Sequence, residues 1–189
     1  MGKGRSGMSS GLEGDKCCVE ASGCAMRWAR RALEELSKRT RIDVIIRDMR
    51  ESGYRSHSWQ MLKRIMSEPI ARCLKDTGPV CGLNCIERIY VADLTGGEYS
   101  YAGYHGGKDM DIIVYNPCET PVDARVLEDK IEECLENAIG IVLNEFLGVE
   151  PKRILGIPNI VEIHVVRDKR DFPYYNMIKS RSSAITRLI

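Results

Sequence analysis

The strongest candidates for a catalytic or metal-binding role are two aspartates in the segment DMDIIVY, at residues 109–115. They flank a single methionine. The rear half of this segment is continuously apolar, which predicts a buried strand. Because side chains alternate along a strand, Asp109 and Asp111 would project from one face with Cα atoms about 7 Å apart. Carboxylates at that spacing repel each other unless a cation lies between them, and such oxygen donors favour Mg²⁺ or Mn²⁺. An isolated pair is also typical of a solvated strand end, so the metal hypothesis needs support elsewhere.

Support comes from two other parts of the chain. Upstream, Gly96 and Gly97 directly follow a predicted strand, IERIYVADL at 86–94, and eleven residues separate them from the first aspartate. Downstream, Glu162 lies in the middle of a third predicted strand, IVEIHVV at 160–166. An acid buried there is costly without a partner, and a metal site shared with the two aspartates would supply one.

Taken together, these elements resemble the nucleotidyltransferases of the DNA polymerase beta superfamily. The shared pattern is a hydrophobic strand, a glycine pair, a short spacer, an Asp–hydrophobic–Asp strand and a third acid on a later strand. The similarity covers residues 85–189, and the stretch after the third acid is similar to the closing part of minimal archaeal and bacterial members. The resemblance implies transfer of a nucleoside monophosphate from a nucleoside triphosphate to a hydroxyl acceptor on RNA, a protein or a small molecule, with release of pyrophosphate.

The resemblance also implies a role for each matching residue. Asp109 and Asp111 would hold two Mg²⁺ (or Mn²⁺) ions, and Glu162 would ligate one of them and help to deprotonate the acceptor. Gly96 and Gly97 would let backbone amides approach the triphosphate, because glycine removes steric bulk where phosphate must come close.

Other residues near these positions are weaker candidates. His164 shares the strand face of Glu162, which makes it a candidate member of the site, although a half-buried, hydrogen-bonded histidine is the commoner case. Lys108 is interpreted as solvated, Asp93 as a turn residue, and nothing in the sequence orients His105.

Three alternatives stay open. Tyrosines between the two Gly-Gly pairs, at 96–97 and 106–107, also fit an antiparallel meander, in which the glycines are structural and the domain is an inactive member of the family. A metal-dependent nuclease would use the same acids together with a Glu-x-Lys unit on a strand, but a Glu-x-Lys unit, at 128–130, lies on a predicted helix. A non-enzymatic module would bind nucleic acid or protein through the arginine-rich helices.

The predicted fold class is α+β, of mixed α/β character: a small mixed sheet with flanking helices, preceded by a helical region. Apolar stripes predict helices over 25–37, continuing to a stop at Ser52-Gly53, and over 57–74, before a Gly78-Pro79 turn. A long helix opens at Thr120-Pro121 with Asp123 as a capping acid and ends at Gly148, and a short helix closes the chain.

One domain of ordinary size accounts for the length of 189 residues. Residues 1–24 are rich in glycine and serine and predict a flexible tail. Residues 25–189 predict a single nucleotidyltransferase-like domain, with 25–78 as a helical extension and 85–189 as the core.

Composition excludes some classes of protein. A net charge of +1 argues against a protein that coats nucleic acid, although the arginine-rich stretch 26–50 leaves a local contact open. No apolar stretch is long enough to span a membrane, and no secretory leader is evident, so we expect a cytoplasmic protein without membrane partners. For this reason the eight cysteines predict neither a disulfide framework nor, at their spacing, a zinc site, and Cys134 is expected in the core.

Overall fold

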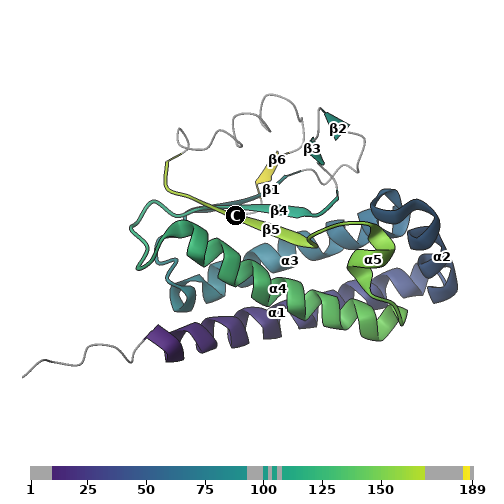
Figure 1. Ribbon diagram of the computed structural model, residues 1–189, viewed down its shortest axis with the longest axis horizontal. Helices are drawn as coiled ribbons and strands as arrows, with labels where there is room; N and C mark the ends of the chain where they lie inside the picture. Colours follow the sequence, from purple (N-terminus) through teal and green to yellow (C-terminus); the bar gives the residue numbers. More distant parts are fainter. Residues whose placement is uncertain (1–9, 93–99, 102–103, 106–107, 169–184, 188–189) are drawn as a thin grey trace, which may run out of the picture.

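A computed structural model describes residues 10–92, 100–101, 104–105, 108–168 and 185–187. Over these residues the chain is α+β, as the sequence predicts, and its helices cover one face of a small sheet (Figure 1). The helices are α1 (Ser10–Arg39), α2 (Ile42–Ser52), the 3₁₀ turn η1 (Gly53–Arg55), α3 (His57–Cys81), α4 (Ala124–Leu147) and α5 (Pro151–Leu155). The strands are β1 (Arg88–Ala92), β2 (Ser100–Tyr101), β3 (Tyr104–His105), β4 (Met110–Tyr115), β5 (Val161–Val166) and β6 (Ile185–Arg187).

The main sheet is mixed and has the strand order β5-β4-β1-β6. β1 pairs antiparallel with β4 on one side and with β6 on the other, whereas β4 pairs parallel with β5. A parallel pair needs a crossover connection, and α4 with α5 provides it. β2 and β3 form a separate antiparallel pair.

The hydrophobic core is continuous from α1 to β5. Figure 1 shows α3 and α4 beneath the sheet and α1 beneath those two helices, on the side away from the sheet. A single cluster of buried side chains includes Leu33 of α1, Trp59 of α3, Leu135 of α4 and Ile163 of β5. The arginine-rich N-terminal helices therefore pack into the same core as the strands.

The prediction of a flexible tail over 1–24 is wrong for the residues that the structure describes, because α1 already begins at Ser10. The buried stripe of its N-terminal half consists of small residues, Cys17, Ala21 and Ala25, which are at most 1% exposed. Small side chains at helical spacing let one helix approach its neighbours closely, so this stripe fits against α3 and α4. It lacks the large apolar residues on which the sequence prediction relied.

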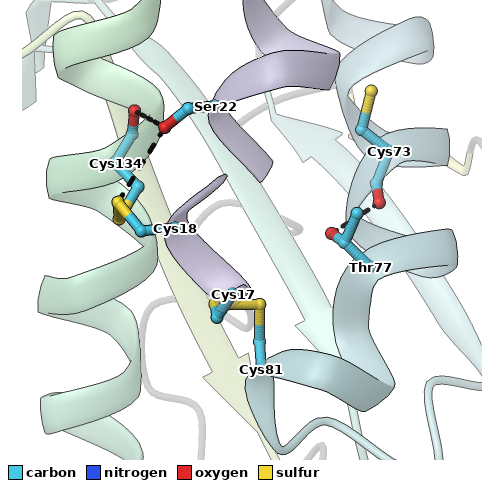
Figure 2. Close-up of a disulfide and its surroundings, with 7 residues drawn as sticks. All are labelled: Cys17, Cys18, Ser22, Cys73, Thr77, Cys81 and Cys134. Atoms are coloured by element: carbon cyan, nitrogen blue, oxygen red, sulfur yellow. Dashed lines mark hydrogen bonds between the residues drawn. A yellow bond between two sulfur atoms is a disulfide. The ribbon is translucent and has the colours of Figure 1, made fainter. Parts of the chain in front are cut away.

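The cysteines correct a second expectation: all eight form disulfides. Three of the bonds fasten the N-terminal half of α1 to the helices on both of its sides, and Figure 2 shows Cys17 bonded to Cys81 with Cys18 close to Cys134. Their Cα–Cα distances, from 4.8 to 5.9 Å, lie in the usual disulfide range. The pairs are Cys17–Cys81, Cys18–Cys134, Cys24–Cys73 and Cys85–Cys118. Cys134 is buried, as expected, but as half of a cross-link.

The outer edge of β5 is covered by carboxylates of α4. Three glutamates spaced four residues apart accept hydrogen bonds from backbone N–H groups of alternate residues of the strand. The spacings agree because four helical residues rise about 6 Å and two strand residues about 6.6 Å. The pairs are Glu128 with Val165 (2.6 Å), Glu132 with Ile163 (3.3 Å) and Glu136 with Val161 (3.0 Å), and Glu136 also accepts from Ile160. An edge strand that would otherwise expose unpaired N–H groups is thus satisfied within the chain.

Several predicted element ends shift. α3 continues through Gly78-Pro79 to Cys81 and ends at Gly82, whose φ of 91° lies in the left-handed region. Pro79 removes one backbone hydrogen bond, and the helix continues for only two residues beyond it. α4 begins after Asp123, whose side chain accepts from the N–H of Arg125 at 2.8 Å, and it ends at Gly148 as predicted.

The end of the chain also differs from expectation. Where a short closing helix was predicted, residues 185–187 form β6 at the sheet edge beside β1. Over the described residues, we find no helix with the length and apolar character that crossing a membrane requires.

Candidate metal centre

The main sheet has one apolar face and one face that carries charge. Alternate side chains of β4 and β5, such as Ile112 and Ile163, are buried in the core with α3 and α4. The intervening positions of the same strands hold Asp111, Glu162 and His164, which therefore lie on the opposite face. Alternation along two neighbouring strands gathers these three polar side chains.

The register of the parallel pair sets how close they come. Asp111 lies opposite Glu162, and His164 follows two residues later on β5. The Nε2 atom of His164 lies 3.5 Å from Oδ1 of Asp111 and 3.8 Å from Oε2 of Glu162. One potential ligand atom from each of the three residues lies within 4.8 Å of the other two. Asn159 donates to the other oxygen of Glu162, Oε1, at 3.2 Å and so orients this carboxylate.

Asp109 lies directly before β4, beside this group. It is 8% exposed, and burial, followed by the charges of Asp111 and Glu162, raises its pKa to about 8. The positive charge of Lys63 acts in the opposite direction. Asp109 is thus electrostatically part of the centre, but it is not among the residues whose ligand atoms lie within 4.8 Å of one another in the described part of the chain.

The first turns of α3 support the segment that carries Asp109. The indole N–H of Trp59 donates to the backbone carbonyl of Lys108 at 2.6 Å, and the Lys108 ammonium lies 5.1 Å from the centre of the Tyr54 ring. Lys63, one turn after Trp59, is only 2% exposed. The sequence signal for this buried cation is a lysine one turn from a tryptophan on an otherwise apolar stripe, a signal not among the predictions above.

The centre is strongly acidic, and this determines the state of His164. Burial lowers the pKa of its imidazole, but the hydrogen bond and charge of Asp111, together with Glu162 and Glu128, outweigh burial and raise the pKa above 6.5. Partial burial likewise raises the pKa of Glu128 and Glu132 above the ordinary glutamate value. Positive charge is therefore favoured at this place, whether on His164 or on a bound cation.

The residues fit a divalent cation. Asp111 and Glu162 offer carboxylate oxygens and His164 an imidazole nitrogen, at separations that one ion can bridge. The Asp111 side chain is 6% exposed, while those of His164 and Glu162 are 23% and 31% exposed, so solvent reaches the group from the β5 side. Bound there, a cation would polarise a phosphate or a water molecule.

The other predicted residues take different places. Gly96, Gly97 and Asp93 lie outside the described residues, and His105 lies in β3. β1 ends with Ala92, which pairs with Asp111 of β4.

Comparison with known proteins finds no match. No protein-family model matches the chain, and neither a curated protein nor a solved structure is similar enough to count as a relative. The resemblance to the DNA polymerase beta superfamily therefore stays a prediction.

Proposed function

We propose that this protein is a divalent-metal-dependent nucleotidyltransferase, which transfers a nucleoside monophosphate from a nucleoside triphosphate to a hydroxyl acceptor on RNA, a protein or a small molecule. One observation carries the proposal: Asp111 and Glu162 face each other across the parallel β4–β5 pair, with Asp109 buried beside them. This is the convergence of acids on neighbouring strands that the chemistry needs.

The sheet also supports the proposed position of the triphosphate. β1 ends with Ala92, which pairs with Asp111. We propose that backbone N–H groups of Gly96 and Gly97, a few residues further along the chain, bind the phosphates. Mg²⁺ or Mn²⁺, when bound, would neutralise charge on the reacting phosphate and on the leaving pyrophosphate.

Each acid has a separate part in this proposal. Asp111 holds the cation and is fixed by its place inside a buried strand, and Asp109 supports the centre from beside it. Glu162 is more exposed, so it is the acid that an acceptor hydroxyl can reach, and it would take the proton of that hydroxyl. Lys63 balances part of the negative charge around Asp109 from the side of α3.

The test is release of pyrophosphate and labelling of acceptors. The full-length protein is incubated with each α-³²P-labelled nucleoside triphosphate, Mg²⁺ or Mn²⁺, and RNA or protein acceptors. Label should be transferred by the wild type, and Asp111→Asn should lower the rate at least about 100-fold. Asp76→Asn, an exposed aspartate of α3, is the matched control and should leave the rate unchanged. Equal transfer by Asp111→Asn and wild type would refute the proposal.

Metal-dependent phosphodiester hydrolysis is a second candidate, favoured by one observation. Nucleases of this kind combine acids with a lysine, and the charge of the buried Lys63 of α3 acts on Asp109, although no Glu-x-Lys unit lies on a described strand. The same reactions decide between the two: cleavage of an added nucleic acid without pyrophosphate release indicates a nuclease. Nucleic-acid binding that survives Asp111→Asn, without either reaction, indicates a binding module.

We propose the cytoplasm as the compartment, since nucleoside triphosphates are cytoplasmic metabolites. This proposal requires that the cysteines of this protein are oxidised to disulfides there. Four disulfides persist in oxidising compartments, and also in the cytoplasm of hyperthermophilic archaea and bacteria. Thiol trapping before lysis of the native cells should then label no cysteine of this chain in the cytoplasmic fraction. Extensive labelling, or recovery of the protein only outside the cytoplasm, would contradict this proposal.

A further inference from the structure

The donor set at the candidate metal centre contains nitrogen as well as oxygen. The resemblance predicts three carboxylates, but the three residues with mutually close ligand atoms are two carboxylates and the imidazole of His164. Asp109, the remaining predicted acid, is buried beside them. The difference bears on which cation the site binds.

Metal ions differ in how they accept imidazole. Mg²⁺ is small and hard, prefers oxygen ligands and keeps several waters, so a nitrogen donor adds little to its binding. First-row transition ions accept imidazole readily, and the affinity of one site rises from Mn²⁺ through Co²⁺ toward Cu²⁺. A site of two carboxylates and one imidazole therefore favours a transition ion over Mg²⁺.

The positions of the side chains match this role. Nε2 of His164 is directed at both acids, at 3.5 Å from Asp111 and 3.8 Å from Glu162, so the nitrogen and both carboxylates face a common point. Asn159 occupies one oxygen of Glu162 and leaves Oε2 on the side of the imidazole. Outer partners of this kind orient ligands in metal sites. β5 supplies two of the three donors from one strand face, which fixes their spacing.

We infer that His164 is a ligand of the divalent cation and makes this site bind Mn²⁺ or Co²⁺ more tightly than Mg²⁺. The inference rests on the metal centre of the proposed function and specifies which ion that centre uses. His164 replaces one of the oxygen donors that the sequence predicted, and Asp109 supports the centre from beside it.

The experiment measures metal binding directly, without activity. Calorimetric titrations of the metal-stripped, full-length protein at pH 8 with MnCl₂, CoCl₂ and MgCl₂ should give Mn²⁺ and Co²⁺ affinities at least about tenfold above that of Mg²⁺. His164→Gln should lower Mn²⁺ and Co²⁺ affinity about 10–100-fold and change Mg²⁺ affinity less than about threefold. His57→Gln, an exposed histidine at the start of α3, is the matched control and should change none of them.

A spectroscopic readout separates ligation from a structural role. Pulsed electron paramagnetic resonance of the Mn²⁺-loaded wild type should show coupling to an imidazole nitrogen, and His164→Gln should lose it. Circular dichroism checks that each variant is folded.

The remaining outcomes distinguish this inference from the proposed function. If Mn²⁺ and Mg²⁺ bind equally and His164→Gln changes neither, the inference is overturned and the carboxylate centre stands. If the wild type binds no divalent cation, or if Asp111→Asn binds all of them as the wild type does, the proposed metal centre fails and the inference fails with it.

Discussion

Removing the Cys18–Cys134 disulfide tests how the cross-links of α1 act together. The bond joins residues separated by 116 positions, and a loop of that length would correspond to about 5 kcal/mol of lost unfolded-state entropy. The other bonds shorten this loop. From Cys18 the covalent path runs one residue to Cys17, across to Cys81, four residues to Cys85, across to Cys118 and sixteen residues to Cys134, about 21 in all. A loop of 21 residues corresponds to about 3 kcal/mol.

We therefore expect the paired change Cys18→Ala with Cys134→Ala to lower the free energy of unfolding by about 3 kcal/mol. In a background that lacks Cys85–Cys118, the shortest path lengthens to about 54 residues, and the same change should cost about 0.8 kcal/mol more. The coupling arises because one disulfide shortens the loop that another closes.

The assay is equilibrium denaturation in guanidinium chloride, followed by circular dichroism, for the wild type, both double variants and the quadruple variant. In excess reductant the difference between the wild type and Cys18→Ala/Cys134→Ala should fall to about 1 kcal/mol or less, since the cross-link is then absent from both and only the two sulfur atoms distinguish them. A cost near 5 kcal/mol without coupling would refute the nested-loop reasoning. A cost below about 1 kcal/mol would show that the bond does not constrain the unfolded chain.

Three further predictions concern the sheet and the segment that carries Asp109. Glu136→Ala leaves two buried N–H groups at the start of β5 without their acceptor and should destabilise the protein by about 2–4 kcal/mol in urea denaturation, whereas Glu136→Gln, which keeps an acceptor oxygen, should cost less than half as much. Trp59→Phe removes the donor to the Lys108 carbonyl and should cost about 1–2 kcal/mol by the same measurement; no loss would contradict the importance of this bond. Folding raises the pKa of Asp109 from 3.8 to about 8, so the folded, metal-free protein holds the Asp109 proton more tightly than the unfolded chain does. The stability gained from this proton is complete below about pH 4 and is lost as pH rises through 8. Asp109→Asn should therefore flatten the fall of unfolding free energy between pH 5 and 9, and an unchanged slope would refute the assignment.

The elements that the sequence predicts best have large apolar residues at a regular period. The strand 109–115 and the stripe of α4 are of this kind, because one face of each is buried by Ile, Leu and Val. The N-terminal half of α1 escapes such a prediction because alanine and cysteine form its buried stripe, and their burial depends on close approach to two other helices. The disulfides were missed for a different reason, because a cytoplasmic protein was expected, and its thiols are ordinarily reduced. Sequence spacing does not reveal that Cys17 lies beside Cys81 until α1 is placed along α3.

The candidate site also has a part that the sequence predicts and a part that depends on contacts between distant elements. Strand alternation predicts that Asp111 points away from the apolar face, and it gives His164 the same face as Glu162. Which residue of β5 lies opposite Asp111 depends on the register of the two strands. In this register α4 forms the crossover between them, and its glutamates accept hydrogen bonds from β5. Lys63 reaches the centre only through packing of α3 under the sheet. Contacts between distant elements are not contained in local periodicity.

The order of layers separates what stabilises this fold from what would bind the metal. Three of the disulfides lie between α1, α3 and α4, in the helical layers, while Asp111, Glu162 and His164 lie on the far face of the sheet. α4 belongs to both arrangements: one bond ties it to α1 through Cys134, and its glutamates hold the edge of the strand that supplies two of the three donors. Fastening α4 from below therefore restricts how far β5 can move relative to β4. In this way cross-links remote from the candidate metal centre help to keep Asp111, Glu162 and His164 at a spacing that one cation could bridge.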